Sequence, residues 1–273
     1  MCPMIESLRL GDRLLSLKSP LVMAIINATP DSFYAASRAE NQTSLGEAFR
    51  RVVDEGAHII DIGACSTRPA TQFGNDELAS EQQEWQRLNM ALSVAGQMNI
   101  VLPISVDTFR ASVAQRAIEE YGVAMINDVS GGSDEMFDLV AQYNVAYVLT
   151  YNRSFAEQTT DNLLSDALAF FSRKVDDLHR RGVSDVVIDP GFGFGQTVEQ
   201  SLTLLDNLSV LKQLGCPILV GISRKRMAYE PAGLTPDTCL GETLRLEQQA
   251  VNQGADILRV HDVMDTRKIL NRK

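Results

Sequence analysis

The chain lacks the features of a secreted, membrane-bound or nucleic-acid-binding protein. None of its apolar runs reaches the roughly 18 residues needed to span a bilayer. Its first 20 residues carry charged side chains in place of the apolar core of a signal peptide. The formal net charge is −10, which repels nucleic acid and anionic membrane surfaces. We therefore expect a cytoplasmic protein that binds neither nucleic acid nor membranes.

Cysteine and histidine are also scarce. The four cysteines, at positions 2, 65, 216 and 239, lack the paired spacing of zinc ligands and predict neither a structural zinc site nor a disulfide framework. His58 begins a predicted strand and His179 lies on a predicted helix, so both are expected to be structural or surface residues. Cys65 follows a strand, where a reactive thiol is an open alternative, but no base is evident beside it. The sequence therefore contains no obvious pair of nucleophile and base.

The sequence does contain short apolar β-type runs that alternate with longer amphipathic segments, a pattern typical of repeated βα units. The predicted strands are 21–27, 58–64, 103–107, 124–129, 146–151, 185–191, 217–223 and 257–262. The predicted helices include 44–55, 76–97, 110–121, 161–181, 198–214 and 235–253. Eight such strands close into a TIM (β/α)8 barrel, and a doubly wound open sheet is the alternative.

No linker or change of composition divides the chain, so we predict a single domain over residues 1–273. Residues before Leu21 are expected to form a short N-terminal extension. A hairpin around Gly11 and Asp12 would cover the bottom of the barrel.

Polar residues follow almost every predicted strand. In a barrel of this class ligands bind at the C-terminal ends of the strands. The polar residues at these ends are Asn27, Thr67, Arg68, Asp107, Asn127, residues 150–152, Asp189, residues 223–225, Arg259 and His261. Any one of them has an ordinary explanation, since asparagine and aspartate cap helices and turns and lysine is commonly solvated. That explanation is less plausible for nearly every strand at once.

The side chains in this set suit a flat nitrogen heterocycle. Asp189 ends an apolar strand and is followed by glycines at 191, 193 and 195, which let the backbone approach a ligand. Carboxylates such as Asp107 and Asp189 accept hydrogen bonds from an amidine-like ring edge. Asn127 can donate and accept on the same ring, and Lys225 can cover a ring carbonyl or the ring face.

A second group suits a phosphorylated arm on that heterocycle. Arg259 and His261 predict a cationic corner for phosphate. A magnesium ion would bridge the phosphate and Asn27, because magnesium takes few protein ligands and keeps its waters. The expected chemistry is displacement of a good leaving group by a nucleophile that a substrate carries, promoted by positioning and electrostatic stabilisation.

A series of short segments, in this order and spacing, resembles the dihydropteroate synthase family over about residues 21–270. They are Asn-Ala-Thr-Pro-Asp-Ser-Phe at 27–33, then 61–63 with 66–69, 105–108, 126–130, the motif at Asp189, 223–226 and 259–262. The resemblance implies a transferase that joins 4-aminobenzoate to a dihydropterin-methyl diphosphate. The products would be dihydropteroate, for folate synthesis, and pyrophosphate.

The resemblance also implies roles for individual residues. The residues implied to hold the pterin are Asp107, Asn127, Asp189 and Lys225. Those implied to hold magnesium and the diphosphate are Asn27, Arg259 and His261. Thr67 and Arg68 would lie in a loop that closes over the site and excludes water. The residues assigned to catalysis are Lys225, Arg68 and Asp107.

The chain departs from the family pattern in several places, among them Cys65 and Gln82-Gln83 in the second loop. Residues 34–37 are Tyr-Ala-Ala-Ser where Ser-Asp-Gly-Gly is common, and Thr150-Tyr151 stands where a His-Met pair ends strand five. Residues 242–247 replace small and apolar residues in a region that packs subunits together in the family, which leaves a homodimer as a possible assembly. Two alternatives therefore stay open. One is a pterin-binding paralogue with weak or no synthase activity, and the other is a methyltetrahydrofolate-binding methyltransferase domain.

Overall fold

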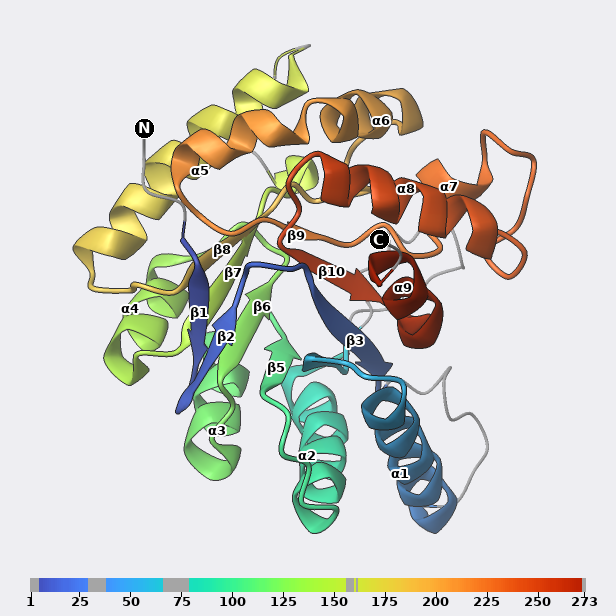
Figure 1. Ribbon diagram of the computed structural model, residues 1–273. Coiled ribbons are helices and arrows are strands. Elements are labelled where there is room, and N and C mark those ends of the chain that lie inside the picture. Colours follow the sequence, from blue (N-terminus) through green and yellow to red (C-terminus); the bar gives the residue numbers. More distant parts are fainter. Residues whose placement is uncertain (1–4, 29–37, 66–78, 156–159, 161, 272–273) are drawn as a thin grey trace.

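Parallel strands form a nearly closed barrel with helices around it in the computed structural model, which describes residues 5–28, 38–65, 79–155, 160 and 162–271 (Figure 1). Within these residues the main sheet has eight strands in the order β8-β7-β6-β5-β4-β3-β10-β9. A single parallel bridge between Ile188 and Ile218 joins its two edges. The predicted TIM barrel is confirmed, and the alternative of an open doubly wound sheet is not.

The strands are shorter than the predicted runs but occupy the same places. Their bounds are β3 Leu21–Asn27, β4 Ile59–Gly63, β5 Ile104–Asp107, β6 Met125–Asp128, β7 Ala146–Thr150, β8 Val186–Asp189, β9 Leu219–Val220 and β10 Ile257–Val260. β-branched and other apolar residues fill both faces, as expected for a parallel sheet covered on both sides. Alternate residues therefore face the helices or the barrel axis.

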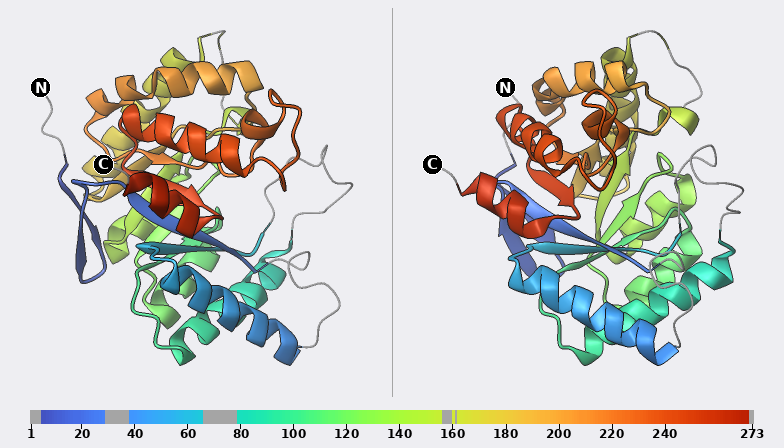
Figure 2. Two further views of the ribbon diagram at one scale, coloured as in Figure 1. Left: turned by 45° about the vertical axis from the view of Figure 1, so that its right-hand side comes forward. Right: turned by 90° about the vertical axis from the view of Figure 1, so that its right-hand side faces the viewer.

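The inward-facing residues at the start of the strands form an apolar plug. Ile59, Met125 and Val187 belong to it, and Leu8 and Leu10 of the N-terminal hairpin pack against it from below. The hairpin consists of β1 Ser7–Leu10 and β2 Arg13–Ser16 and turns at Gly11. Figure 2 shows it at the end of the barrel from which the strands start. The predicted extension under the barrel is thus confirmed.

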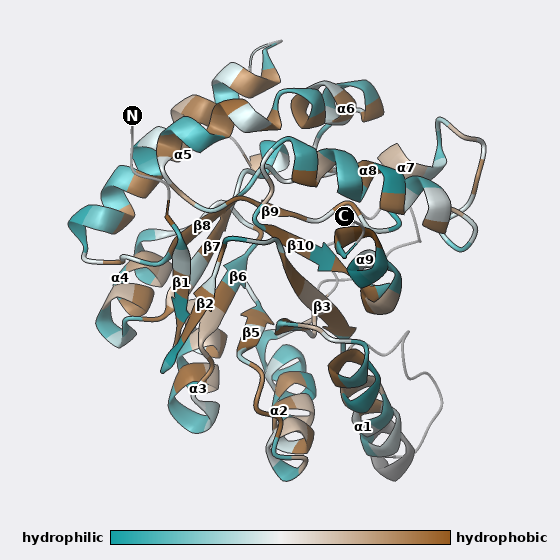
Figure 3. Cartoon of the chain, in the orientation of Figure 1, coloured by the Kyte–Doolittle hydropathy of each residue, from teal (hydrophilic) through white to brown (hydrophobic). Residues whose placement is uncertain are grey.

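The helices bury one face against the outside of the barrel and expose the other, as the alternation of brown and teal along each helix in Figure 3 illustrates. Their bounds are α1 Arg38–Asp54, α2 Glu81–Gln97, α3 Ala111–Tyr121, α4 Asp134–Tyr143, α5 Leu163–Arg180, α6 Val198–Asp206, α7 Arg226–Tyr229, α8 Leu240–Asn252 and α9 Val263–Leu270. In the described part of the chain, no helix is long and apolar enough to cross a membrane.

The observed helices differ in part from the expected ones. The helix predicted over 198–214 ends at Asp206, and residues Leu208–Leu214 continue as a 3₁₀ helix. At the break, the Asn207 side chain donates a hydrogen bond to the carbonyl oxygen of Thr203, an asparagine capping interaction that competes with helix continuation. The sequence reading also did not specify α4, although Ser133 caps it by accepting a hydrogen bond from the backbone N–H of Met136.

Candidate functional site

The barrel interior changes from apolar to polar toward the C-terminal ends of the strands. Above the plug, the inward-facing positions are occupied by Asp61, Ser105, Asn127, Thr150, Asp189 and Arg259. Adjacent strands keep these residues together, since Asp61 pairs with Ser105, Asp107 with Asn127, and Thr150 with Asp189 in the sheet register. Parallel strands therefore gather at one rim polar groups that lie far apart in sequence.

Asp61 is the centre of this polar layer. Its side chain is fully buried, and its Oδ1 accepts a hydrogen bond from Ser105 Oγ at 2.6 Å. Its Oδ2 accepts from Asn127 Nδ2 at 3.0 Å and from Arg259 Nε at 2.6 Å. A buried carboxylate is stable in such a place because charged and neutral donors replace its lost water. Sequence reasoning placed Asp61 in a motif but assigned it no role.

Arg259 lies between two carboxylates. Besides Asp61, its Nη2 donates to Asp107 Oδ2 at 2.7 Å. Burial opposes the charge of Arg259, but the Asp61 and Asp107 carboxylates outweigh it and raise the pKa of the guanidinium. The guanidinium of Arg259 is therefore shared by both neighbouring acids, and its expected role in binding phosphate stays a prediction.

Asp107 has an unusual protonation equilibrium. Burial raises its pKa to about 7, against the opposing effect of Arg259. The negative charges of Asp61, Asp128 and Glu84 add to the effect of burial and raise the pKa of Asp107 further. Asp107 does not cap the helix that follows it, because α3 starts after Arg110 with no side-chain cap. The capping explanation for Asp107 is therefore wrong.

Asn127 presents a single free acceptor. Its Nδ2 is used by Asp61, and its Oδ1 is buried without a hydrogen-bond partner in the described residues. One N–H of the Asn127 amide is thus committed to Asp61, and its second N–H and the Oδ1 acceptor leave the expected contact of both amide ends with a ligand as a prediction. Because a carboxylate accepts and does not donate, Asp61 fixes the orientation of the amide.

Asp189 and Lys225 form the opposite side of the layer. Asp189 Oδ1 accepts a hydrogen bond from the backbone N–H of Gly191 at 2.8 Å, and burial raises the pKa of its carboxyl, opposed by Lys225. Lys225 Nζ donates to the carbonyl oxygen of Phe192 at 2.6 Å and lies 5.0 Å from the centre of the Phe194 ring. Burial lowers the pKa of Lys225 to about 8. Lys225 also feels the charges of Asp107 and Arg259, which places all these groups around one space.

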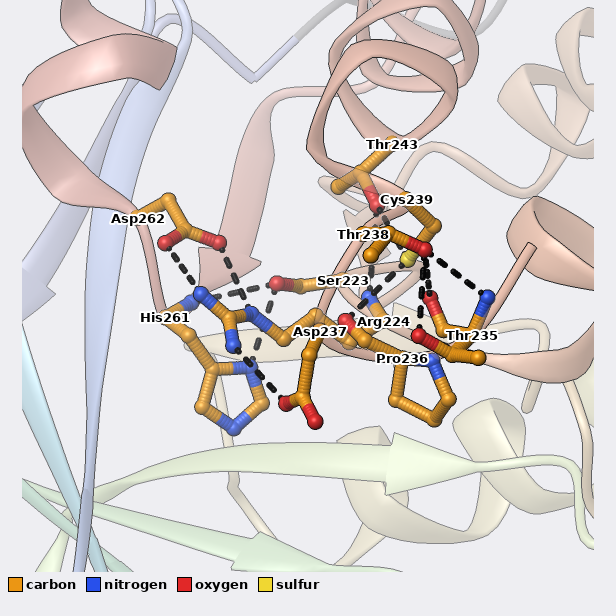
Figure 4. Close-up of polar contacts among 10 residues, drawn as sticks. All are labelled: Ser223, Arg224, Thr235, Pro236, Asp237, Thr238, Cys239, Thr243, His261 and Asp262. Carbon is orange, nitrogen blue, oxygen red and sulfur yellow. Dashed lines mark hydrogen bonds and ion pairs between the residues drawn. The ribbon is translucent and has the colours of Figure 1, made fainter.

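The turn that delivers Lys225 is held by an ion pair (Figure 4). Arg224 has φ +57°, a left-handed conformation that is uncommon for a residue other than glycine. Its Nε and Nη2 donate to the two oxygens of Asp262 at 3.1 and 2.7 Å. In the same view His261 Nδ1 lies 3.1 Å from Ser223 Oγ. The loops after β9 and β10 are thus fastened together beside the site.

The predicted magnesium ligand, Asn27, lies at the same rim, two strands away from Asp107. A Cβ built on Gly63 would be 3.7 Å from both Asn27 Oδ1 and Asp107 Oδ2, so these oxygens flank a space that glycine leaves open. No three His, Cys, Asp or Glu side chains of the described residues are placed to hold a metal ion together. This donor set fits magnesium that takes most of its ligands from a diphosphate and water.

Several predicted positions lie outside the described residues. They are Thr67 and Arg68, most of the first-loop motif, and the departing residues 34–37. Of the remaining site residues, the structure brings Asp107, Asn127, Asp189, Lys225 and Arg259 around one space, with Asn27 and His261 at its rim.

His58 and Cys65, expected to be structural or unreactive, behave accordingly. His58 Nδ1 accepts a hydrogen bond from the backbone N–H of Val22 at 2.8 Å, and its Nε2 lies 3.0 Å from Arg267 Nη1. Burial, followed by the charge of Glu84, raises the pKa of the Cys65 thiol. A raised pKa disfavours the thiolate and hence a reactive cysteine.

Comparison with known proteins gives a consistent result. Residues 23–261 match the pterin binding enzyme family. The dihydropteroate synthase of Bacillus subtilis is 35% identical over 248 residues, which cover 89% of this chain and 84% of that protein.

Solved structures agree with the sequence matches. The Xanthomonas albilineans dihydropteroate synthase with 4-aminobenzoic acid superposes with a TM-score of 0.87 at 33% identity, covering 97% of this chain and 96% of the other. The Thermus thermophilus dihydropteroate synthase in complex with 6HMPPP gives 0.82 at 32% identity, with 97% of each chain covered. The chain therefore belongs to the pterin-binding enzyme family, among the dihydropteroate synthases.

Proposed function

We propose that this chain is a transferase that condenses 4-aminobenzoate with dihydropterin-6-ylmethyl diphosphate to give 7,8-dihydropteroate and pyrophosphate. The observation that carries the proposal is the buried Oδ1 of Asn127, which has no partner among the described residues and lies within a polar layer that includes Asp107, Asp189 and Lys225. A buried acceptor without a partner is costly unless a ligand supplies the donor. The dihydropteroate synthases that match this chain support the choice of substrates.

The pterin would lie across the polar layer. Asp107 and Asp189 accept hydrogen bonds from the N–H groups of its guanidine-like edge, and Asn127 Oδ1 accepts one more. Lys225 donates to an acceptor on the ring while its remaining contact with Phe192 holds the ammonium in place. Each contact pairs a donor with an acceptor in a desolvated site, where such bonds discriminate strongly.

The diphosphate would lie toward Asn27, Arg259 and His261. Arg259 can serve it only by sharing a guanidinium that now contacts Asp61 and Asp107. Transfer of the Asp107 carboxylate from Arg259 to the pterin edge would release part of that guanidinium for the incoming anion. Asn27 would hold a magnesium ion that neutralises charge on the diphosphate.

The chemical step requires no protein nucleophile. The amine nitrogen of 4-aminobenzoate forms a bond to the pterin methylene carbon, the bond from that carbon to the diphosphate oxygen breaks, and the nitrogen loses one proton. The protein holds the two reactants in line and stabilises charge as the diphosphate leaves. Thr67 and Arg68 are proposed to belong to the loop that closes over the reactants.

The test is a pyrophosphate-release assay with both substrates and magnesium. We expect release that requires 4-aminobenzoate, and loss of pterin binding in Lys225→Ala and Asp189→Ala. Pterin binding without release that depends on 4-aminobenzoate would contradict the proposed synthase and favour a paralogue that only binds the pterin. Unchanged pterin affinity in either variant would refute the assignment of the pocket.

We further propose a cytoplasmic homodimer of single-domain subunits, each a barrel over residues 1–273. Support comes from the family resemblance. The mass in solution, measured by light scattering, tests the dimer.

A further inference from the structure

Thr150 is a buried polar residue that the proposed contacts leave unexplained. It ends β7, and its side chain is completely buried. Two and four positions earlier, Val148 and Ala146 belong to the plug inside the barrel, whereas Tyr147 and Leu149 pack toward the helices. Because side chains of a strand alternate in direction, Thr150 also faces the barrel interior.

The neighbours of Thr150 are the residues of the candidate pterin site. In the sheet register it lies beside Asp189 of β8, and Asn127 of β6 lies beside Val148, one inward-facing position below it. Its methyl group is near Gly191, since a Cβ built there would be 3.2 Å from Thr150 Cγ2. Thr150 thus belongs to the wall that links Asn127 to Asp189.

The hydroxyl of Thr150 has no partner in the described residues. The buried side-chain oxygens without a hydrogen bond there are Asn127 Oδ1, Thr150 Oγ1 and Tyr151 OH. Two of the three therefore belong to inward-facing residues of neighbouring strands at the same rim. Valine has the same shape as threonine without the polar atom, so packing alone gives no reason for a hydroxyl at this position.

We propose that Thr150 is a specificity-determining residue whose hydroxyl hydrogen-bonds the dihydropterin ring between Asn127 and Asp189. The inference rests on the proposed function, because that function supplies the ligand. It also gives a role to a position where the sequence departs from the family pattern. The pocket would then prefer a heterocycle with a polar atom at this edge over one with a carbon atom there, since the latter leaves the hydroxyl unpaired.

The experiment compares two variants of Thr150 with the wild type. Thr150→Val removes the hydroxyl and keeps the shape, and Thr150→Ser keeps the hydroxyl. We expect Thr150→Val to bind dihydropterin diphosphate about tenfold more weakly by calorimetric titration, and Thr150→Ser to stay within about threefold of the wild type. The melting temperature of Thr150→Val without ligand should equal or exceed that of the wild type, because an unpaired buried polar group has been removed.

Thr266→Val is the matched control. Thr266 is equally buried, but its Oγ1 donates to Glu247 Oε2 at 2.8 Å on the outer side of the barrel. This variant should melt at a lower temperature and bind the pterin with unchanged affinity. Loss of the hydroxyl should therefore weaken pterin binding but not lower the melting temperature at Thr150, and should lower the melting temperature but not change binding at Thr266.

The outcomes separate this inference from the proposed function. Equal pterin affinity of Thr150→Val and the wild type would overturn the role of Thr150, even in an active synthase. Pterin binding without pyrophosphate release would overturn only the condensation, and a tenfold ratio of affinities would still support Thr150 as a ring contact. A wild type that fails to bind the pterin would overturn both.

Discussion

The carboxylate of Asp61 accepts a hydrogen bond from Asn127 Nδ2 at 3.0 Å, and this contact decides how Asn127 meets a ligand. It commits one amide N–H to the protein, and Oδ1 is buried without a hydrogen-bond partner in the described residues. The same carboxylate oxygen accepts from Arg259 Nε at 2.6 Å. Asp61 therefore orients two groups of the site, the uncharged amide of Asn127 and the charged guanidinium of Arg259.

Asp61→Asn should lower the affinity for dihydropterin diphosphate about tenfold or more. The substituted amide can donate as well as accept, so the Asn127 side chain loses its fixed orientation and Arg259 loses one charged partner. Calorimetric titration measures the affinity, and circular dichroism checks the fold. Ser105→Ala is the control, because it removes a hydrogen bond from Asp61 Oδ1 without touching Asn127 or Arg259. Equal losses in the two variants would argue against a positioning role.

A plot of kcat/KM against pH should have the shape of a narrow bell. Asp107, whose pKa burial raises to about 7, must be ionised to accept hydrogen bonds from the pterin, so the rate rises through that pH. Lys225, whose pKa burial lowers to about 8, must be protonated to donate, so the rate falls above it. Steady-state kinetics over pH 5.5 to about 9.5 would measure both limbs. In any Lys225→Arg enzyme that retains activity, the alkaline limb should disappear, because arginine keeps its charge. Its persistence would assign the limb to another group.

Asp262→Ala should reduce kcat/KM about tenfold while the protein remains folded. The carboxylate holds Arg224 in its left-handed conformation, and Lys225 follows directly in the chain. Without the ion pair the turn samples other conformations, and Lys225 is displaced from its contact with Phe192. Asp265→Ala removes an exposed ion pair with Lys268 on the neighbouring helix and should change neither rate nor stability by more than about twofold. A wild-type value of kcat/KM in Asp262→Ala would show that the turn at Arg224 keeps its conformation without the ion pair.

Gly191→Ala should prevent stable folding or lower the free energy of unfolding by several kcal/mol. Gly191 has φ +68°, and a Cβ there would lie 2.0 Å from the carbonyl oxygen of Tyr151. Gly233 has a similar φ of +64° but no atom within 4 Å of its Cβ position. Gly233→Ala should therefore cost about 1 kcal/mol, from the backbone conformation alone. Urea denaturation of both variants separates steric overlap from backbone strain, and equal losses would contradict the close approach of β7 and β8.

Glu247→Gln should stabilise the protein at pH 8 and leave its stability nearly unchanged at pH 4.5. Glu247 is buried on α8, and burial raises its pKa from 4.5 to about 7. The native state therefore holds a proton that the unfolded chain has released between these two values, so wild-type stability falls as the pH rises through this range. Glutamine accepts the same hydrogen bond from Thr266 without a charge. Calorimetric melting at both pH values should reveal a gain of up to about 3 kcal/mol at pH 8. An equal gain at both values would mean that ionisation is not its source.

The sequence alone determined the architecture and the location of the site. β-branched runs such as Val186–Ile188 need burial on both faces, and their spacing between amphipathic segments leaves few folds other than a barrel. The polar residue that ends each run, such as Asp107 or Asp189, then falls at one rim by topology. These conclusions depend on the local periodicity of apolar and polar residues, which can be read from short segments of the sequence.

The tertiary structure alone decided which polar groups are committed to each other. Asp61 and Arg259 are 198 positions apart, and they meet only because β10 lies beside β3 and β3 beside β4 in the closed sheet. That contact makes Asp61 the centre of the layer and commits the Arg259 guanidinium to carboxylates. At the same rim, Asn127 and Thr150 have side-chain oxygens without a hydrogen-bond partner among the described residues. Hydrogen bonds and ion pairs act over a few ångströms. The sequence pattern therefore shows which polar groups reach the rim. Their hydrogen-bond and ion-pair partners are decided only when the barrel closes.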